Sequence, residues 1–255
     1  MYIVMVKKLI VDCESLIYRS CVATQEMREI EDGVFTQVYV IDKGIQYLKD
    51  QLDKYMLATG AEDYIFVLGS SENYRKIVNP KYKSNRTSTP HPMLKTMIDK
   101  TSEVFKTTYL PYLEADDTCR IIYEEDKFNN IIVSIDKDLR TFFCRLYNPD
   151  RPNEGIVNIS NKVAQFNFFK QLIMGDSCDG YEGIKGYGEV KTKRWLLEKD
   201  RTLEDICDLY VENGYTIKDF NCVYDMAKIL SVNDYKDGVI KLKASSFDTT
   251  SGKEF

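Results

Sequence analysis

The sequence predicts an α/β fold built around a parallel sheet. Three short runs of β-branched and apolar residues are typical of buried strands: K-L-I-V-D-C (8–13), Y-I-F-V-L-G (64–69) and N-I-I-V-S-I-D (130–136). Segments with helical spacing of apolar residues separate these runs, and strands that alternate with helices and are buried on both faces favour a parallel sheet. We therefore expect a three-layer α/β domain over roughly residues 1–170.

The elements between the strands follow from local patterns. Apolar residues recur at helical spacing over 40–57, 93–105 and 115–125, which predicts three helices. The stretch 79–92 is polar and rich in proline towards its end, which predicts a loop.

The character of the chain changes after Gly175. A glycine-punctuated turn over 180–188 precedes a basic helix expected over 189–198. T-L-E-D at 202–205 has the form of a capping box, which marks the start of the next helix. A last helix is expected around Phe220, Val223, Ala227 and Leu230, and the polar tail 244–255 is expected to fray. We expect two regions, 1–174 and 175–255, packed as one unit.

Composition excludes several classes of protein. The chain has 255 residues, 44% of them hydrophobic, and no apolar run approaches the roughly 20 residues of a membrane span. The apolar start ends at Asp12 without a cleavage site, so we expect no signal peptide. Seven cysteines that are never spaced C-x-x-C, with a single histidine, exclude zinc, haem and Ser-His-Asp chemistry. We expect an intracellular protein whose thiols are packing residues.

The net charge of −5 hides a segregated distribution. Residues 74–106 hold eight basic and two acidic residues, a net charge of +6, and residues 185–199 have a net charge of +3. The negative charge is partly gathered in tight clusters elsewhere. Basic islands around an acidic pocket are typical of proteins that bind phosphates and hold divalent cations.

Carboxylates recur where a parallel sheet would bring them together. They follow candidate strands or begin candidate helices, and the C-terminal edge of such a sheet is where ligands bind. Any one acid pair at a helix start is also typical of a cap or a helix-dipole partner. Together they predict Mg²⁺ or Mn²⁺, because hard cations take oxygen ligands and relieve the repulsion between acids. The acids are Asp12, Glu114, Asp116, Asp117, Asp136, Asp138, Asp176 and Asp179.

The glycine-rich turn suits phosphate contact. Glycines allow close approach of the backbone, and the N–H groups at the start of the following helix point at an anion. A glycine cluster alone is more often just a tight turn, but its neighbours here favour phosphate contact. Here basic residues follow it directly, at Lys191, Lys193 and Arg194, and Asp176 and Asp179 precede it.

In this order the motifs resemble the 5′-nuclease family of flap endonucleases and 5′→3′ exonucleases. The resemblance is strongest to the compact phage members and to the 5′-nuclease domain of bacterial DNA polymerase I. It covers residues 8 to about 199. The motifs that carry it are Asp12, Y-K-S-N-R (82–86), E-A-D-D (114–117), S-I-D-K-D (134–138), and G-D-S-C-D (175–179) with G-I-K-G-Y-G (183–188).

The resemblance implies a PIN-like nuclease core with a helical arch at about 86–110. It also implies a helix–three-turn–helix DNA-binding motif at 176–199, which often holds K⁺. By motif position, one divalent metal would be held by Asp12, Glu114 and Asp116. The second would be held by Asp116, Asp136, Asp138 and Asp179, with Asp117 and Asp176 in support.

The resemblance further implies that Lys83 and Arg86 contact the scissile phosphate and that Tyr82 stacks on a base. The residues alone leave two alternatives open: a solvated loop for the two basic residues, and a core aromatic for Tyr82. In the helix–three-turn–helix motif, the expected DNA contacts are Lys185, Gly186, Gly188, Lys191, Thr192 and Lys193.

One position departs from the family pattern. After the strand at 64–69 the family has an aspartate metal ligand, whereas this chain has Ser70, with Glu72 near enough to compensate.

The function we expect is a metal-dependent, structure-specific 5′ nuclease of branched or 5′-ended DNA in replication or repair. RNA primers in RNA–DNA duplexes are a further expected substrate. We expect a monomer in the cytoplasm of a bacterial or phage-infected cell, with no membrane partner. Because Ser70 replaces the family's aspartate, a second hypothesis of another class stays open: a DNA-junction binding protein with weak or lost catalysis. A PIN-type ribonuclease is disfavoured, because such domains lack the glycine turn.

Overall fold

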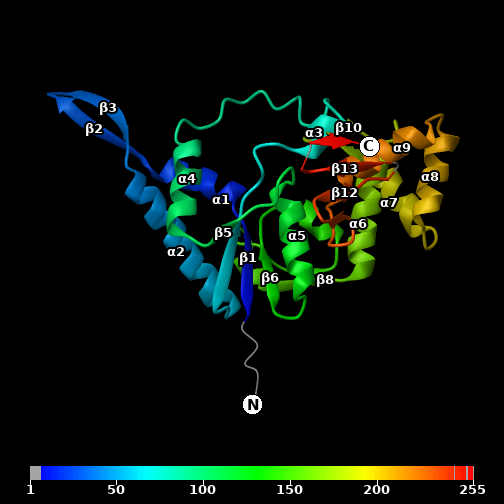
Figure 1. The fold of residues 1–255 in the computed structure, drawn as a ribbon, viewed down its shortest axis with the longest axis horizontal. Coiled ribbons are helices and arrows are strands. Elements are labelled where there is room, and N and C mark those ends of the chain that lie inside the picture. Colours follow the sequence, from blue (N-terminus) through cyan, green and yellow to red (C-terminus); the bar gives the residue numbers. More distant parts are fainter. Residues whose placement is uncertain (1–6, 244, 251, 255) are drawn as a thin grey trace, which may run out of the picture.

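The computed structural model describes residues 7–243, 245–250 and 252–254, and a six-stranded sheet lies at its centre (Figure 1). The strand order is β5–β4–β1–β6–β7–β8, and every neighbouring pair is parallel except β7 and β8. The predicted α/β class with a mainly parallel sheet is therefore confirmed. The strands are β1 (Lys8–Asp12), β4 (Asp63–Val67), β5 (Thr107–Thr108), β6 (Asn130–Val133), β7 (Cys144–Tyr147) and β8 (Ile156–Ile159).

Helices cover both faces of this sheet. On one face Val11 packs in a cluster with Leu48 and Met97, and on the other Ile10 packs in a cluster with Cys119. The alternation of adjacent β1 residues between the two clusters explains why the strand sequence is apolar throughout. The first face carries α1 (Glu14–Ala23), α2 (Ile41–Thr59) and α4 (Leu94–Val104), and the second carries α5 (Ala115–Glu125) and α6 (Asn161–Met174).

A two-stranded hairpin, β2 (Gln25–Glu31) and β3 (Val34–Tyr39), projects from the body between α1 and α2 (Figure 1). Sequence analysis did not predict it. Its apolar side chains are largely in solvent: Met27 is 65% exposed and Phe35 is 57% exposed.

The loop predicted at 79–92 is present and follows α3 (Tyr74–Val78). Figure 1 shows this segment crossing above the C-terminal edge of the sheet towards α4. Helix α4 itself packs on the core through the buried residues Met97 and Thr101. Within the expected arch at 86–110, the part that stands over the sheet edge is therefore the non-helical segment before α4.

The region after α6 builds a second helical layer and a small sheet. Its helices share an apolar cluster with Tyr82 and Tyr181, and its sheet packs on α3 and α5 through Tyr74, Ile121 and Phe247. The elements are β9 (Gly175–Asp176), β10 (Tyr181–Glu182), α7 (Glu189–Leu197), α8 (Leu203–Glu212), α9 (Ile217–Ala227), β11 (Tyr235–Lys236), β12 (Val239–Lys241), β13 (Ser246–Asp248) and β14 (Lys253–Glu254); short 3₁₀ turns η1 (Asp138–Thr141) and η2 (Pro152–Glu154) lie earlier.

Two expectations about this region have clear outcomes. The capping box is confirmed, because Thr202 and Asp205 exchange side-chain and backbone hydrogen bonds at the start of α8. The expectation of a frayed tail is wrong, since β12, β13 and β14 pair in one antiparallel sheet that buries Phe247. Three tail positions, 244, 251 and 255, lie outside the described residues.

The thiols are only partly packing residues. All seven cysteines are free, and four of them are buried, but Cys178 and Cys222 are exposed, which corrects the expectation for these two. None of the described helices is long and apolar enough to cross a membrane.

A buried ion pair fixes α5 relative to its neighbours. Arg75, 2% exposed, donates to both carboxylate oxygens of the fully buried Asp117, at 2.6 and 2.8 Å. The same guanidinium donates to the carbonyl oxygens of Met226 and Lys228, while Asp117 accepts from the backbone N–H of Leu230 at 2.9 Å. Helix α3, the start of α5 and the chain after α9 therefore meet at one charged contact.

We expect Asp117→Asn to destabilise the fold by about 3–5 kcal/mol, because the buried Arg75 guanidinium loses its bidentate counter-ion and keeps only the longer contact with Glu114. The matched control is Asp150→Asn at the exposed pair between Arg19 and Asp150, where both side chains are more than 40% exposed. That change should cost less than about 1 kcal/mol. Urea unfolding measures both unfolding free energies. Equal losses of stability in the two variants would show that the buried pair contributes no more than the exposed one.

Candidate active site

A cleft opens at the C-terminal edge of the sheet, where β1 and β6 end and α5 begins. Its volume is about 520 Å³. Parallel strands bring their carboxyl ends to one edge, so Asp12 at the end of β1 and Asp136 shortly after β6 face the same space as Asp116 in the first turn of α5. The cleft is lined by Asp12, Glu14, Ser15, Lys83, Arg86, Glu114, Ala115, Asp116, Ile135, Asp136 and Lys137.

Ser134 positions two of the acids. Its hydroxyl donates to Asp12 Oδ2 at 2.7 Å and accepts from the backbone N–H of Asp136 at 2.9 Å. Asp136 Oδ1 in turn accepts from the backbone N–H of Asp138 at 2.8 Å. The S-I-D-K-D motif is therefore a local turn that holds Asp136 opposite the end of β1.

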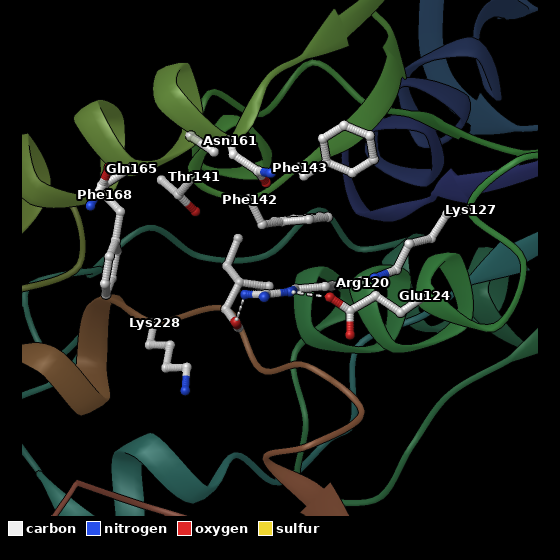
Figure 2. A pocket seen from close by; sticks show the side chains of 12 residues that line it. Arg120, Glu124, Lys127, Thr141, Phe142, Phe143, Asn161, Gln165, Phe168 and Lys228 are labelled. Carbon is white, nitrogen blue, oxygen red and sulfur yellow. Dashed lines mark hydrogen bonds and ion pairs between the residues drawn. The ribbon is translucent and has the colours of Figure 1, made fainter.

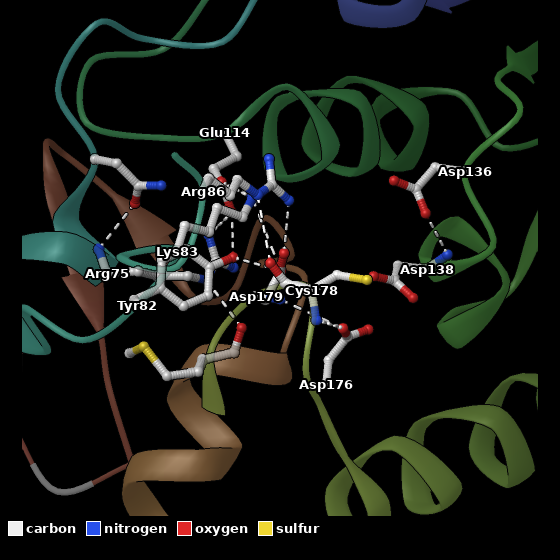
Figure 3. Close-up of polar contacts among 12 residues, drawn as sticks. Arg75, Tyr82, Lys83, Arg86, Glu114, Asp136, Asp138, Asp176, Cys178 and Asp179 are labelled. Carbon is white, nitrogen blue, oxygen red and sulfur yellow. Dashed lines mark hydrogen bonds and ion pairs between the residues drawn. The ribbon is translucent and has the colours of Figure 1, made fainter. Parts of the chain in front are cut away.

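The opposite wall is cationic. Arg86 donates to Asp179 Oδ1 at 2.7 Å, and the Lys83 ammonium pairs with Glu114 and lies 3.8 Å from Asp179 Oδ2 (Figure 3). Glu114 Oε2 also accepts from Arg75 at 3.2 Å. The structure thus brings both predicted basic residues to the cleft, in direct contact with predicted metal ligands.

Tyr82 does not offer a face to a base, which corrects that expectation. Its side chain is 2% exposed, and its ring packs between the Lys83 ammonium and Tyr181. Its hydroxyl lies 2.8 Å from Glu114 Oε2 and 2.9 Å from Asp179 Oδ2. Because a phenol has a single proton, Tyr82 donates to one carboxylate at a time and holds the two close together. The core-aromatic alternative is the one the geometry favours.

Four other predicted ligands do not line this cleft, although one of them, Asp179, contacts its cationic wall at Lys83 and Arg86. Asp117 faces Arg75 on the far side of the α5 start, where both its oxygens are occupied. Asp138 and Asp176 line a neighbouring cavity of about 330 Å³, and Lys137, which lines both cavities, donates to Asp176 Oδ2 at 3.1 Å. Asp176 also accepts backbone hydrogen bonds from Cys178 and Asp179. Asp117 has a supporting role instead: its carboxylate accepts a hydrogen bond from the backbone N–H of Glu114 at 3.2 Å.

Sequence analysis missed Glu14, which lines the cleft beside Asp12. The signal was present, because D-C-E places a second acid at the first position of α1, directly after a strand. The predicted substitute for Ser70, Glu72, is not in the cleft: it is exposed and lines neither cavity. Ser70 lines a separate cavity under α4.

Burial and, after it, the charges of neighbouring acids raise the pKa values of three of these carboxyl groups. Burial, together with the charge of Asp136, raises the pKa of Asp12 to about 6. Burial and the charges of Asp12 and Glu114 raise the pKa of Glu14 to about 7, and burial with Asp136 raises that of Asp138 to about 7. Glu114 differs: burial opposes ionisation, but Arg75 and Lys83 hold its pKa below the usual range.

The donor set suits a hard divalent cation. All titratable oxygen donors of the cleft are carboxylates, and the described residues put no histidine or cysteine side chain among its lining. Across the described ranges, no three acidic, His or Cys side chains converge into a ready-made metal cage. The physical reason is visible in Figure 3: Lys83 and Arg86 occupy the carboxylates of Glu114 and Asp179.

The DNA-contact residues predicted for this motif lie outside the cleft, on the turn before α7 and within the first turns of α7 itself. Gly188 caps α7, and Lys185, Gly186, Lys191 and Lys193 are exposed around it. Lys191 rests on the ring of Tyr187, and Lys193 pairs with Glu189 at 2.8 Å. Thr192 is fully buried and its hydroxyl donates to the carbonyl oxygen of Tyr187, so its side chain faces the protein interior in this structure.

Another cavity, of about 640 Å³, lies elsewhere and holds none of the predicted residues (Figure 2). Two of its three cations are engaged: Arg120 donates to Glu124 and to the carbonyl oxygen of Ile229, and Lys228 donates to Asp234. The chemistry of the acids, rather than size, identifies the cleft at the sheet edge as the candidate site.

Comparison with known proteins identifies the family that this chain resembles. The profile of the family described as 5'-3' exonuclease, N-terminal resolvase-like domain, matches residues 7–157. The exodeoxyribonuclease of Enterobacteria phage T3 and the exonuclease of Escherichia phage T7 are each 26% identical over 201 residues, covering 71% of this chain. The chain spans 64% of the length of each of these two phage proteins. A 5'-3' exonuclease of Buchnera aphidicola is 25% identical over 213 residues, covering 78% of this chain and 72% of its own length.

Solved structures show the same fold. T5 5'-exonuclease with zinc bound aligns with a TM-score of 0.60 at 17% identity, over 87% of this chain and 86% of its own. The catalytic core of Rad2 in complex with DNA substrate aligns with a TM-score of 0.54 at 16% identity, over 87% and 78%.

The crowded acids predict a pH dependence of stability. Without metal, we expect the free energy of unfolding to fall as pH rises from about 4.5 to about 7.5. In this window Asp12, Glu14 and Asp138 hold protons in the folded state that they release when unfolded, because their folded pKa values of about 6, 7 and 7 exceed the ordinary 3.8, 4.5 and 3.8.

Asp12→Asn should therefore raise the unfolding free energy at pH 7.5 in EDTA by roughly 1–3 kcal/mol and flatten the pH profile. Asp53→Asn, at an exposed position of α2, is the matched control and should change neither. Urea unfolding between pH 4.5 and 7.5 measures both. A less stable Asp12→Asn protein at pH 7.5 would refute the repulsion between the acids.

Proposed function

Because this chain belongs to the 5'-3' exonuclease family, whose N-terminal resolvase-like domain it carries, we propose that it is a metal-dependent, structure-specific 5′ nuclease. Its substrates are branched or 5′-ended DNA, including 5′ flaps and nicks, and the RNA of RNA–DNA duplexes. We place it in replication or repair, as a monomer acting where bacterial or phage DNA is copied in the cytoplasm.

The observation that carries the proposal is the cleft itself. It gathers Asp12, Asp116 and Asp136 on one wall and faces them with Lys83 and Arg86 on the other. Mg²⁺ or Mn²⁺ bound by these oxygens would lower the pKa of a bound water and neutralise the leaving oxygen. Lys83 and Arg86 sit on flexible stems and, once released from Glu114 and Asp179, are placed to pair with phosphate oxygens.

The turn between α6 and α7 is the part of the chain that binds duplex DNA. The exposed N–H groups at the start of α7, next to Lys185 and Lys191, suit a backbone phosphate. We place K⁺ in the same turn. Gly180 links this turn to the cleft, because a Cβ there would lie 2.9 Å from Lys81 O and 3.4 Å from the backbone N of Lys83.

The direct test is incubation of labelled 5′-flap DNA with Mg²⁺, with EDTA as control. Release of a labelled fragment only with the metal supports the nuclease. Tight binding of the flap without cleavage in Mg²⁺ or Mn²⁺ would instead establish the rival, a DNA-junction binding protein, which the neutral Ser70 favours.

Asp12→Asn and Asp179→Asn should each lower cleavage by roughly three orders of magnitude, about 4 kcal/mol of transition-state stabilisation. Each variant should bind flap DNA in Ca²⁺ nearly as tightly as the wild type, because DNA binding is assigned to the α6–α7 turn. Gel-based cleavage and fluorescence anisotropy measure the two, with Asp53→Asn as control. Turnover near that of the wild type in either variant would exclude the acid from the site.

Lys191→Ala should weaken duplex binding and lower the slope of log affinity against log salt by about 0.9, one lost phosphate contact. Lys49→Ala, at an exposed position of α2, should leave the slope unchanged. Lys83→Ala should instead lower turnover with little effect on duplex affinity. If Lys83→Ala instead weakened duplex binding and Lys191→Ala lowered turnover, the roles assigned to these two residues would be reversed.

Tyr82→Phe separates the two roles of this side chain. If Tyr82 acts through its hydroxyl, as its contacts with Glu114 and Asp179 indicate, the variant should lose roughly tenfold in turnover, about 1.4 kcal/mol. If the ring stacked on a base, phenylalanine would serve equally well. Single-turnover cleavage of the flap substrate decides between them.

A further inference from the structure

The carboxylate of Glu14 stands in the cleft without a partner. Among residues 7–243, 245–250 and 252–254, no hydrogen bond or ion pair reaches it, although it lines the same space as Asp12 and Asp116. The carboxylate of Glu114 is in the opposite situation, since Lys83, Arg75 and Tyr82 all contact it. Of these two glutamates, Glu14 is the one whose oxygens are free to bind a ligand.

Gly69, directly after β4, leaves room for this carboxylate. A Cβ at Gly69 would lie 2.4 Å from Glu14 Oε1 and 3.7 Å from the backbone N of Ala115. Gly69 is not among the glycines with positive φ, so its backbone does not require glycine. What requires it is the space that Glu14 occupies, between the end of β4 and the start of α5.

The chain that follows Gly69 brings no carboxylate of its own to this side of the cleft. Ser70 is neutral and lines the cavity under α4, and the exposed Glu72 does not line the cleft. The acid at the β4 side therefore comes from α1. It is held there by its place at the first helical position, two residues after Asp12.

We propose that Glu14 is a metal ligand of this cleft and supplies, from α1, the carboxylate that the β4 edge lacks at Ser70. The inference rests on the proposed metal-dependent function. Hard divalent cations bind oxygen ligands, and an anionic oxygen that no protein cation already neutralises is the stronger candidate. Gly69 is, on this view, a positioning residue that acts only through Glu14.

The test is Mn²⁺ binding without DNA, measured by isothermal titration calorimetry and by the loss of the free-Mn²⁺ electron paramagnetic resonance signal. Glu14→Gln should weaken Mn²⁺ binding about tenfold. Gly69→Ala should weaken it similarly, because the new methyl group displaces the flexible end of Glu14. The matched control Glu72→Gln should bind like the wild type. Thermal melting in EDTA verifies that each variant is folded.

A conservative substitution gives the sharpest result. Glu14→Asp, which keeps a carboxylate at the position that lines the cleft, should retain most of the affinity that Glu14→Gln loses. A folded Glu14→Gln protein with unchanged Mn²⁺ affinity would overturn the role of Glu14 alone. A wild-type protein that binds no Mn²⁺ would overturn the metal-dependent function as well, so the two failures are distinguishable.

Discussion

Repulsion between carboxylates at one edge of the sheet is the constraint on which the rest of this structure depends. Parallel strands force Asp12 and Asp136 together, and α5 adds Asp116. Cationic side chains from distant parts of the chain, including Lys83 and Arg86, pair with acids at this edge of the sheet. These cations, which offset part of the negative charge of the metal-free cleft, are the ones that we propose contact the substrate, so stability and chemistry depend on one set of charges.

Two sets of long-range contacts fix this cleft relative to the rest of the chain. Arg75 joins α3 to α5 and to the chain after α9, and it reaches Glu114 as well as Asp117. The close approach of Gly180 to the Lys81–Lys83 backbone joins the α6–α7 turn to the cationic wall. On our proposal, a duplex bound by this turn would therefore lie in a fixed position relative to the acids, as cleavage at a defined distance from a junction requires.

Features that depend on local pattern and chain order are predictable from this sequence. Apolar runs identify β1, β4 and β6, and the strand ends locate Asp12 and Asp136. Partners that depend on the fold are not predictable in this way, such as Arg75 for Asp117, or the burial of Tyr82 and Thr192 by neighbours far along the chain. The β2–β3 hairpin does have a local signal: Asp32-Gly33 lies between two stretches of mixed apolar and polar residues. A search for continuously apolar, buried strands overlooks it. Glu14 escapes notice because a lone acid at a helix start is usually only a dipole partner.

The central claim, that the acids at the sheet edge hold divalent metal, is tested most directly by anomalous diffraction from crystals of the protein soaked in Mn²⁺. Our account predicts anomalous density in the cleft, in contact with Asp12 and Asp116, and with the Lys83 ammonium turned away from Glu114. Density absent from the cleft at millimolar Mn²⁺, or confined to surface sites elsewhere, would contradict it.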